Sequence, residues 1–414
     1  MMEVPARPLG VRLLNGFGRT AGRLGVPLVR LDEAGLLARA ARRTGLEDFG
    51  DDAFREPFRV LLESLEGEAA LTLLGRAIAR DDLVRLLENR LRMVAARARH
   101  PEIAAGKVER PLFIVGLPRT GTTILHELLA QDPANRVPMT WEVMHVHPAP
   151  ERATYATDPR IAAVEKRLAG VDRLIPGFKA MHPMGAELPQ ECVALTAHDF
   201  ASMLFPSTHT VPSYQAWLDQ ADLRWVYASH RRQLQYLQWR CPAERWVLKS
   251  PGHLWALDAL FAEYPDARVV QTHRDPVRVV ASLANLVALL RSMASDRIDR
   301  AAIGAEWTER LARGLTSAMA VRERRAPDAP PVFDMHFAEF VRDEIAMVRR
   351  IYAHFELELS AEAEARMRRF LAANPKDKHG AHRYALADAG LDPATERARY
   401  ARYQQRYGIT SEPV

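Results

Sequence analysis

Pro111-Leu-Phe-Ile-Val-Gly-Leu-Pro-Arg-Thr-Gly-Thr-Thr-Ile-Leu125 is the stretch that decides the fold of this chain. An apolar run of the kind found in buried strands leads into a tight turn and then into a helical pattern. Gly116 and Gly121 flank the turn, and glycine lets the backbone bend and approach a ligand closely. Bare backbone N–H groups at the N-terminus of a helix, where the helix dipole is positive, bind phosphate-like anions. The stretch therefore predicts a loop that holds a phosphate or a sulfate group.

The residue after Gly121 narrows the chemistry of this loop. The G-x-x-x-x-G spacing is that of a phosphate loop, but Thr122 stands where a nucleoside triphosphatase has the lysine that reaches the β- and γ-phosphates. The turn also supplies one cation, Arg119, and the hydroxyls of Thr120, Thr122 and Thr123. We therefore expect an anion other than a nucleoside triphosphate.

The composition is that of a soluble globular protein. The chain has 414 residues, 48% hydrophobic and 26% charged, enough for one large or two medium domains. Only two cysteines are present, which excludes a disulfide scaffold and favours a cytoplasmic location. We expect no signal peptide and no integral membrane segment, because no apolar run is long enough. The net charge of +5 is dispersed among acidic residues, so we expect no nucleic-acid partner.

The pattern of apolar residues changes near residue 106. Residues 1–105 carry apolar side chains at three- and four-residue spacing, which predicts an α-helical N-terminal region that packs on the main domain or serves a homodimer. From residue 106 to 414, β-rich runs alternate with helical stretches, which predicts an α/β fold with a parallel sheet flanked by helices. Residues 151–240 read as a helical insertion. The expected strands are Leu112–Gly116, Arg245–Lys249, Arg268–Thr272 and Val332–His336.

Polar residues cluster at the ends of these strands. The phosphate loop, Lys249 and Arg274 each follow a strand, and parallel sheets bind ligands beyond the carboxyl ends of their strands. The helical insertion carries aromatic residues that fit either a core seam or an apolar lining for an acceptor pocket. These aromatic residues are Tyr214, Trp217, Trp225, Tyr227, Tyr236 and Trp239.

Two further basic segments suit a phosphate. In Thr272-His-Arg-Asp-Pro276, Arg274 stands at a strand end, Pro276 begins a helix, and Ser282 lies two turns along it. A guanidinium offers a planar fork to a phosphate and a serine adds a neutral donor. The later segment Lys376–Tyr384 is rich in basic residues around Gly380, and reads either as a solvated loop or as a lid over an anion.

Together, these elements resemble the sulfotransferases that use 3′-phosphoadenosine-5′-phosphosulfate (PAPS). The likeness is to the bacterial sulfotransferase-family proteins, and it covers roughly residues 106–395. The family implies that the 5′-phosphosulfate is cradled by Arg119, Thr120, Gly121, Thr122 and Thr123. It implies that the 3′-phosphate is bound by Arg274 and Ser282, with Lys378, His379 and Gly380 as the closing loop. No metal is needed, since PAPS has no γ-phosphate and protein cations can hold it.

The same resemblance suggests the catalytic residues. Lys249 is similar to the family lysine that neutralises charge on the bridging oxygen as the bond breaks. Glu142 resembles the catalytic glutamate of tyrosyl-protein and related bacterial sulfotransferases, and it would take the acceptor proton. His253 is a second candidate base, although the family histidine lies two residues after the lysine, where Pro251 stands. Glu187 and Glu191 suit either a helix start or the acceptor site.

The leading hypothesis is therefore a PAPS-dependent sulfotransferase that releases 3′-phosphoadenosine-5′-phosphate (PAP). Its acceptor would be a hydroxyl, or an amine, of a small molecule, a lipid or a sugar. Two alternatives stay open, namely another phosphate-loop transferase and a non-catalytic nucleotide-binding protein that kept the fold. His145 and His147 lack a third ligand of suitable spacing, so no metal site is expected.

Overall fold

The computed structural model describes residues 7–24, 28–174, 184–375 and 386–413. Its centre is a parallel sheet with the strand order β2-β3-β1-β4-β5. The strands are β1 (Leu112–Gly116), β2 (Asn135–Arg136), β3 (Arg245–Lys249), β4 (Arg268–His273) and β5 (Val332–His336). The predicted α/β fold is confirmed. All four expected strands are present, β4 extends one residue further than expected, and the short β2 was missed because two residues carry no periodic signal.

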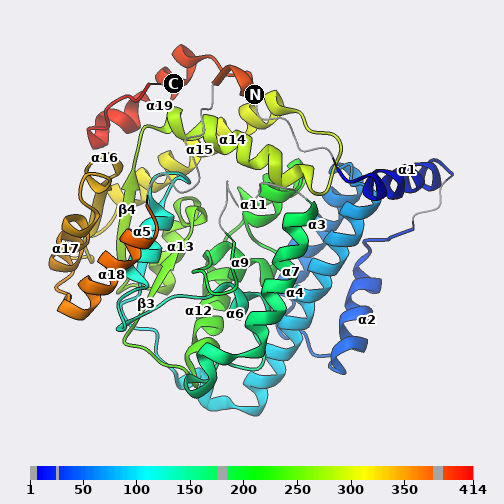
Figure 1. Cartoon of the computed structure of the whole chain (residues 1–414), viewed down its shortest axis with the longest axis horizontal. Coiled ribbons are helices and arrows are strands. Elements are labelled where there is room, and N and C mark those ends of the chain that lie inside the picture. The colour runs from blue at the N-terminus through cyan, green and yellow to red at the C-terminus, as the bar shows by residue number, and fades with distance from the viewer. Residues whose placement is uncertain (1–6, 25–27, 175–183, 376–385, 414) are drawn as a thin grey trace.

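Helices cover both faces of this sheet (Figure 1). One face packs Ile114 and Val270 against α5 (Thr122–Leu129), α17 (Glu344–His354) and α18 (Ala361–Ala373). The opposite face packs Phe113 and Leu248 against the core that includes α12 (Arg224–Gln238), α13 (Leu257–Glu263), α14 (Pro276–Ser292) and α15 (Arg300–Glu323). The strands are therefore buried on both sides, as their continuous apolar sequences require.

The N-terminal helices form a second layer beside the sheet. They are α1 (Leu9–Arg23), α2 (Glu33–Thr44), α3 (Arg55–Gly67) and α4 (Leu73–Arg99), and α1 projects from the rest (Figure 1). Phe54 and Phe58 contact Phe200, which joins this layer to the helices between α6 (Thr140–Met144) and β3. Those helices are α7 (Pro159–Leu174), α9 (Cys192–Thr196), α10 (Leu204–Thr208), α11 (Pro212–Leu218) and α12. The N-terminal layer thus shares its core with the expected insertion.

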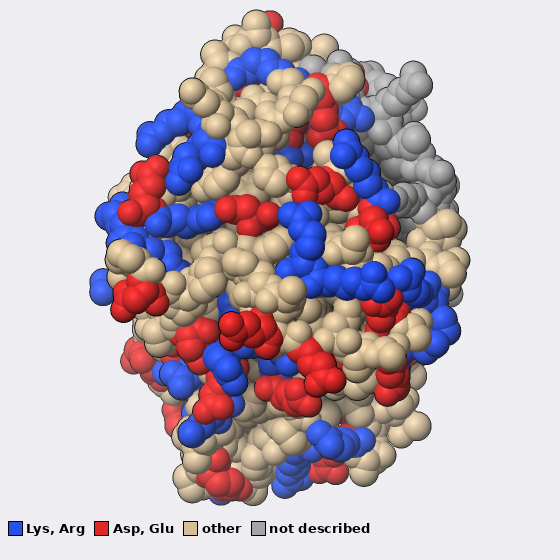
Figure 2. Space-filling model, turned by 90° about the vertical axis from the view of Figure 1, so that its left-hand side faces the viewer, with Lys and Arg blue, Asp and Glu red and all other residues tan. Residues whose placement is uncertain are grey.

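The C-terminal segments return to the carboxyl end of the sheet. The helix α16 (Phe337–Phe340) follows β5, and α19 (Pro393–Tyr407) contacts α14 and α15. Figure 2 shows the face that carries α16 to α19, where basic and acidic side chains are interspersed. No described helix is long and apolar enough to cross a membrane.

Candidate active site

The phosphate loop turns sharply between β1 and α5. Gly121 has a φ of 87° and Arg119 has a φ of 66°, so two residues of the turn lie in the left-handed region. A Cβ atom on Gly121 would lie 3.1 Å from a ring carbon of Phe340 and 3.2 Å from one of Phe337. Glycine is needed here both for the backbone conformation and for the close contact with α16.

This turn leaves its amide groups available to a ligand. Among the described residues, none accepts a hydrogen bond from the backbone N–H groups of residues 119–123, whereas the N–H of Leu125 already bonds to the Gly121 carbonyl. The unpaired groups stand at the positive end of α5. They form a concave set of donors of the kind that binds an oxyanion.

The threonines of the loop make different contacts. The Thr120 hydroxyl is buried, donates to the Leu117 carbonyl at 2.6 Å and lies 2.5 Å from the Thr272 hydroxyl of β4. Its side chain therefore fastens the loop to the sheet, and only its backbone is free for a ligand. Thr123 is exposed, and its hydroxyl lies 3.4 Å from the Lys249 ammonium.

Lys249 ends β3 directly beneath the loop. Its ammonium forms an ion pair with Glu191, which precedes α9. The lysine side chain is 3% exposed and the glutamate side chain is 23% exposed, so the carboxylate faces the solvent side of the pair. Behind Lys249, burial and the lysine charge lower the pKa of His126 to about 3, and this neutral imidazole contacts the Val247 carbonyl.

Arg274 lies against the phosphate loop. It follows β4, and one of its Nη atoms donates to the Arg119 carbonyl at 2.9 Å. Its guanidinium stacks 4.1 Å from the centre of the Phe337 ring. The Glu412 carboxylate occupies the rest of the fork, with contacts of 2.8 and 2.7 Å. The phosphate loop and Arg274, the two predicted anion-binding groups, therefore lie together. The Glu412 carboxylate already occupies the guanidinium of Arg274. Ser282 lies half-buried on α14, as expected from the spacing.

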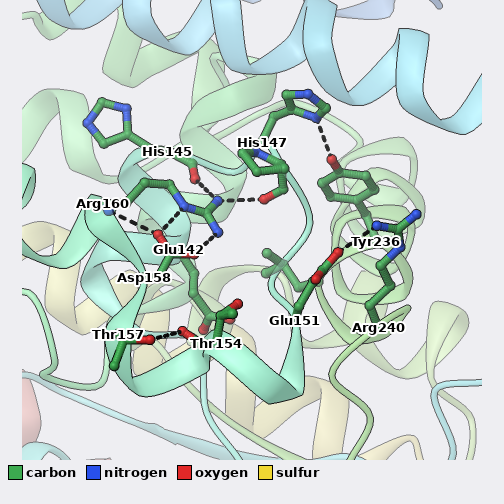
Figure 3. Close-up of polar contacts among 12 residues, drawn as sticks. Glu142, His145, His147, Glu151, Thr154, Thr157, Asp158, Arg160, Tyr236 and Arg240 are labelled. Carbon is green, nitrogen blue, oxygen red and sulfur yellow. Dashed lines mark hydrogen bonds and ion pairs between the residues drawn. The ribbon is translucent and has the colours of Figure 1, made fainter.

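Glu142 lies fully buried in the first turn of α6, and its predicted catalytic role stays a prediction. Its carboxylate is fully buried and accepts hydrogen bonds from the Met139 N–H at 2.9 Å and from Arg136 at 2.5 Å. Arg136 in turn stacks on the Trp246 ring at 4.3 Å. These contacts stabilise the start of α6 and leave no face of the carboxylate for an acceptor. The neighbouring His145 and His147 point apart, and His147 bonds to Tyr236 at 2.7 Å (Figure 3).

His253 lines a cavity next to the ion pair of Lys249 and Glu191. The cavity has a volume of about 300 Å³, and its wall includes Cys192 and Ser250, the chain neighbours of that pair. His253 Nδ1 lies 2.6 Å from the Tyr227 hydroxyl, and burial holds the pKa of His253 well below its usual range. A permanently neutral imidazole is a weak base, but it can bind a ligand.

The structure adds residues that the sequence analysis did not single out. Glu412, Thr272 and Arg310 each contact or line the site described above. The residues that they contact lie far away in the sequence, so no local motif indicates their place in the site. Of the aromatic residues in the insertion, Tyr214 and Tyr236 lie in cores, and Tyr227 belongs to a core and also lines the cavity. Their part in an acceptor pocket stays a prediction. Lys378, His379 and Gly380 fall outside the described residues.

Metal-ligating side chains do not gather in the described part of the chain. No group of three or more histidine, cysteine, aspartate or glutamate residues is placed there to hold an ion. The site as a whole is a lysine-free phosphate loop with an arginine fork and a buried lysine at neighbouring strand ends. It defines a protein that binds an anionic group and can neutralise charge beside it.

Comparisons with known proteins identify the family. Residues 111–361 match the model of the sulfotransferase family. The chain therefore belongs to this family and is a sulfotransferase, as the motifs predicted. It is 24% identical over 300 residues to the omega-hydroxy-beta-dihydromenaquinone-9 sulfotransferase Stf3 of Mycobacterium bovis, covering 68% of this chain and 71% of the relative.

Two solved structures share the fold over nearly the whole chain. The sulfotransferase STF1 of Mycobacterium tuberculosis is 36% identical with a TM-score of 0.80, and the alignment covers 90% of this chain and 98% of STF1. The sulfotransferase STF9 of Mycobacterium avium is 32% identical with a TM-score of 0.84, and the alignment covers 92% of this chain and 98% of STF9. The similarity thus includes the N-terminal helices as well as the sheet.

Proposed function

We propose that this sulfotransferase uses PAPS and transfers its sulfuryl group to an alcohol by in-line displacement. The observation that carries this proposal is the contact between Arg274 and the Arg119 carbonyl at 2.9 Å. It puts an arginine fork at the edge of a loop of free N–H groups. A donor with a 5′-phosphosulfate and a 3′-phosphate needs two anion sites at this short separation.

Each part of the donor has a matching group. The N–H groups of residues 119–123 would bind the 5′-phosphosulfate, and Arg274 with Ser282 would bind the 3′-phosphate. Lys249 would neutralise the bridging oxygen as the sulfur–oxygen bond to PAP breaks. The Thr122 position lacks the lysine that a γ-phosphate requires, which favours PAPS over ATP.

The contacts favour Glu191 as the base. The acceptor oxygen attacks sulfur, PAP leaves with the bridging oxygen, and the hydroxyl proton passes to a carboxylate within hydrogen-bond reach. Glu191 contacts Lys249 and remains partly exposed, whereas Glu142 is fully buried between two donors. His253 stays the second candidate base, and burial, which holds its pKa well below the usual range, favours the carboxylate.

The acceptor is proposed to be a lipophilic alcohol. A relative is named for an omega-hydroxylated menaquinone derivative, which carries a hydroxyl on an apolar chain. The cavity beside Glu191 combines apolar side chains such as Val193 and Leu223 with polar ones. The two free thiols, Cys192 and Cys241, support the prediction of a cytoplasmic location. A homodimer stays a prediction.

A thermal-shift experiment with PAP and ATP tests the donor site. A ligand that binds only the native state raises its stability by mass action, so PAP should raise the melting temperature far more than ATP at equal concentration. Arg274→Ala should weaken PAP binding by about 2–3 kcal/mol, the loss expected for a charge-assisted hydrogen bond. Arg42→Ala, which removes an exposed arginine of α2 in the N-terminal layer, is the control. Equal shifts with PAP and ATP would contradict the proposal.

A further inference from the structure

Arg310 is a buried cation in the wall of the cavity beside His253. It lies on α15 and is 1% exposed. Its Nε and one Nη atom are buried without a hydrogen-bond partner among the described residues. A guanidinium out of water with unpaired donors costs several kcal/mol, so such groups in proteins normally meet an acceptor.

Neighbouring groups do not supply that acceptor. Asp219 lies 2.9 Å from Arg313 and Glu306 lies 2.7 Å from Arg291, and both charges act on Arg310 without a hydrogen bond to it. The cavity wall also carries the carboxylates of Asp219, Asp222 and Asp258, and Asp219 Oδ2 has no hydrogen-bond partner among the described residues. The rings of Trp307 and Trp255 lie 5.1 and 5.6 Å from the guanidinium carbon and offset only part of the charge. Burial lowers the pKa of Arg310 to about 10, which leaves it protonated at neutral pH.

Two further donors in the same cavity wall lack partners. Trp255 Nε1 and His253 Nε2 are buried without a hydrogen-bond partner among the described residues. When the Tyr227 hydroxyl donates to His253 Nδ1, the proton of the neutral ring lies on Nε2. The Trp255 ring is held against α15 at Gly314, where a Cβ atom would lie 2.5 Å from the indole. The cavity wall therefore carries the guanidinium of Arg310 and two further unpartnered N–H donors.

We propose that this cavity binds the carboxylate of a hydroxy acid acceptor, with Arg310 as its anchor. This inference rests on the proposed sulfotransferase function and specifies its acceptor class. Cys192 and Ser250, the chain neighbours of Glu191 and Lys249, line the same cavity as Arg310, so the proposal has the hydroxyl of an acceptor held at Arg310 reach toward that ion pair. The volume of about 300 Å³ lies at the lower end of small-molecule pockets, which suits a lipophilic hydroxy acid with a slender chain.

Calorimetric titration with 12-hydroxydodecanoate and 1,12-dodecanediol, each in saturating PAP, tests this proposal. The two probes have the same chain length and differ in the carboxylate. The wild-type protein should bind the acid at least tenfold more tightly than the diol. Arg310→Met should remove this preference, and Arg310→Lys should keep part of it. Arg324→Met is the matched control, because Arg324 lines the same cavity but is exposed, and it should keep the preference.

Several results would overturn the proposal. They are equal affinity of the wild-type protein for both probes, no binding of the acid, or an equal loss of preference in Arg310→Met and Arg324→Met. PAP affinity is measured separately for each variant and should not change. If PAP fails to bind the wild-type protein while the acid preference persists without it, the proposal of PAPS as the donor fails and the carboxylate site stands.

Discussion

At the scale of single residues, two glutamates that look alike in the sequence differ in the groups that they contact. Glu142 and Glu191 both stand near the start of a short helix, where the dipole favours a negative charge. The structure gives Glu142 two buried donors and gives Glu191 a lysine at the edge of the phosphate loop. One arrangement stabilises the fold, and the other can accept a proton.

Glu191→Gln should abolish most turnover and leave the donor site intact. Loss of a general base typically costs about 10²–10⁴-fold in rate. Glu142→Gln should instead lower the free energy of unfolding by about 3–5 kcal/mol, because it leaves Arg136 as an uncompensated buried charge. Transfer of radiolabelled sulfate from PAPS to a lipid extract measures the first effect, and urea unfolding measures the second.

Glu47→Gln, which changes an exposed glutamate of the N-terminal region, is the control for both measurements. Wild-type turnover in Glu191→Gln, together with lost turnover and unchanged stability in Glu142→Gln, would return the catalytic role to Glu142.

At the scale of elements, the segment that follows α19 lies against Arg274. Gly408 ends α19 in the left-handed conformation, and the chain then brings Glu412 to Arg274. Asp275 accepts from the Glu412 N–H at 2.7 Å and from Arg397 at 2.5 Å, and Arg397 also donates to the Glu412 carbonyl at 2.6 Å. The carboxylate thus stands where a 3′-phosphate would bind.

Glu412→Gln should therefore tighten PAP binding. A phosphate must displace this carboxylate, and a partly exposed ion pair contributes about 0.2–1 kcal/mol, so the affinity should rise by up to about fivefold. Isothermal titration with PAP measures the change. Glu66→Gln is the control, because Glu66 holds Arg76 through two contacts of 2.6 Å among the N-terminal helices. Weaker PAP binding in Glu412→Gln would show that the carboxylate positions Arg274 instead.

At the scale of the whole molecule, burial keeps many histidines neutral. Burial is the first cause of the lowered pKa in each case, and it disfavours the charged imidazolium. The pKa falls to about 3 for His126 and His230, and to about 4 for His198 and His209, from an ordinary value near 6.5. A lower pH must therefore reduce the free energy of unfolding through buried histidines that are distributed over the sheet and the helical layers.

Stability should fall as the pH drops below about 6.5. In that window the unfolded chain binds protons that the folded protein excludes, so each such histidine costs about 1.4 kcal/mol per pH unit down to its folded pKa. Urea unfolding between pH 7.5 and pH 4.5 measures the slope. His230→Asn, which keeps a polar group for Tyr264, should reduce it. His100→Asn changes a partly exposed histidine and should leave the slope unchanged, and an equal slope in all three proteins would contradict the prediction.

The sequence predicted the strands because their signal is local. A run such as Phe113-Ile-Val is buried on both faces, and its continuous apolar pattern ends at a glycine turn. The spacing around Gly121 likewise predicted the loop that the structure shows. The helical N-terminal region was recognisable from periodicity, but its shared core with Phe200 was not, since that contact joins two distant segments.

By itself, then, the sequence determined the parallel sheet, the phosphate loop and the sulfotransferase family, because each rests on residues adjacent in the chain. Only the tertiary structure decided which sequence-distant groups lie together around the phosphate loop. Lys249 meets Glu191 across 58 positions, and Arg274 meets the Arg119 carbonyl across 155. The unpaired charge of Arg310 also emerged only there, because burial and hydrogen bonding depend on the packing of elements that are distant in sequence.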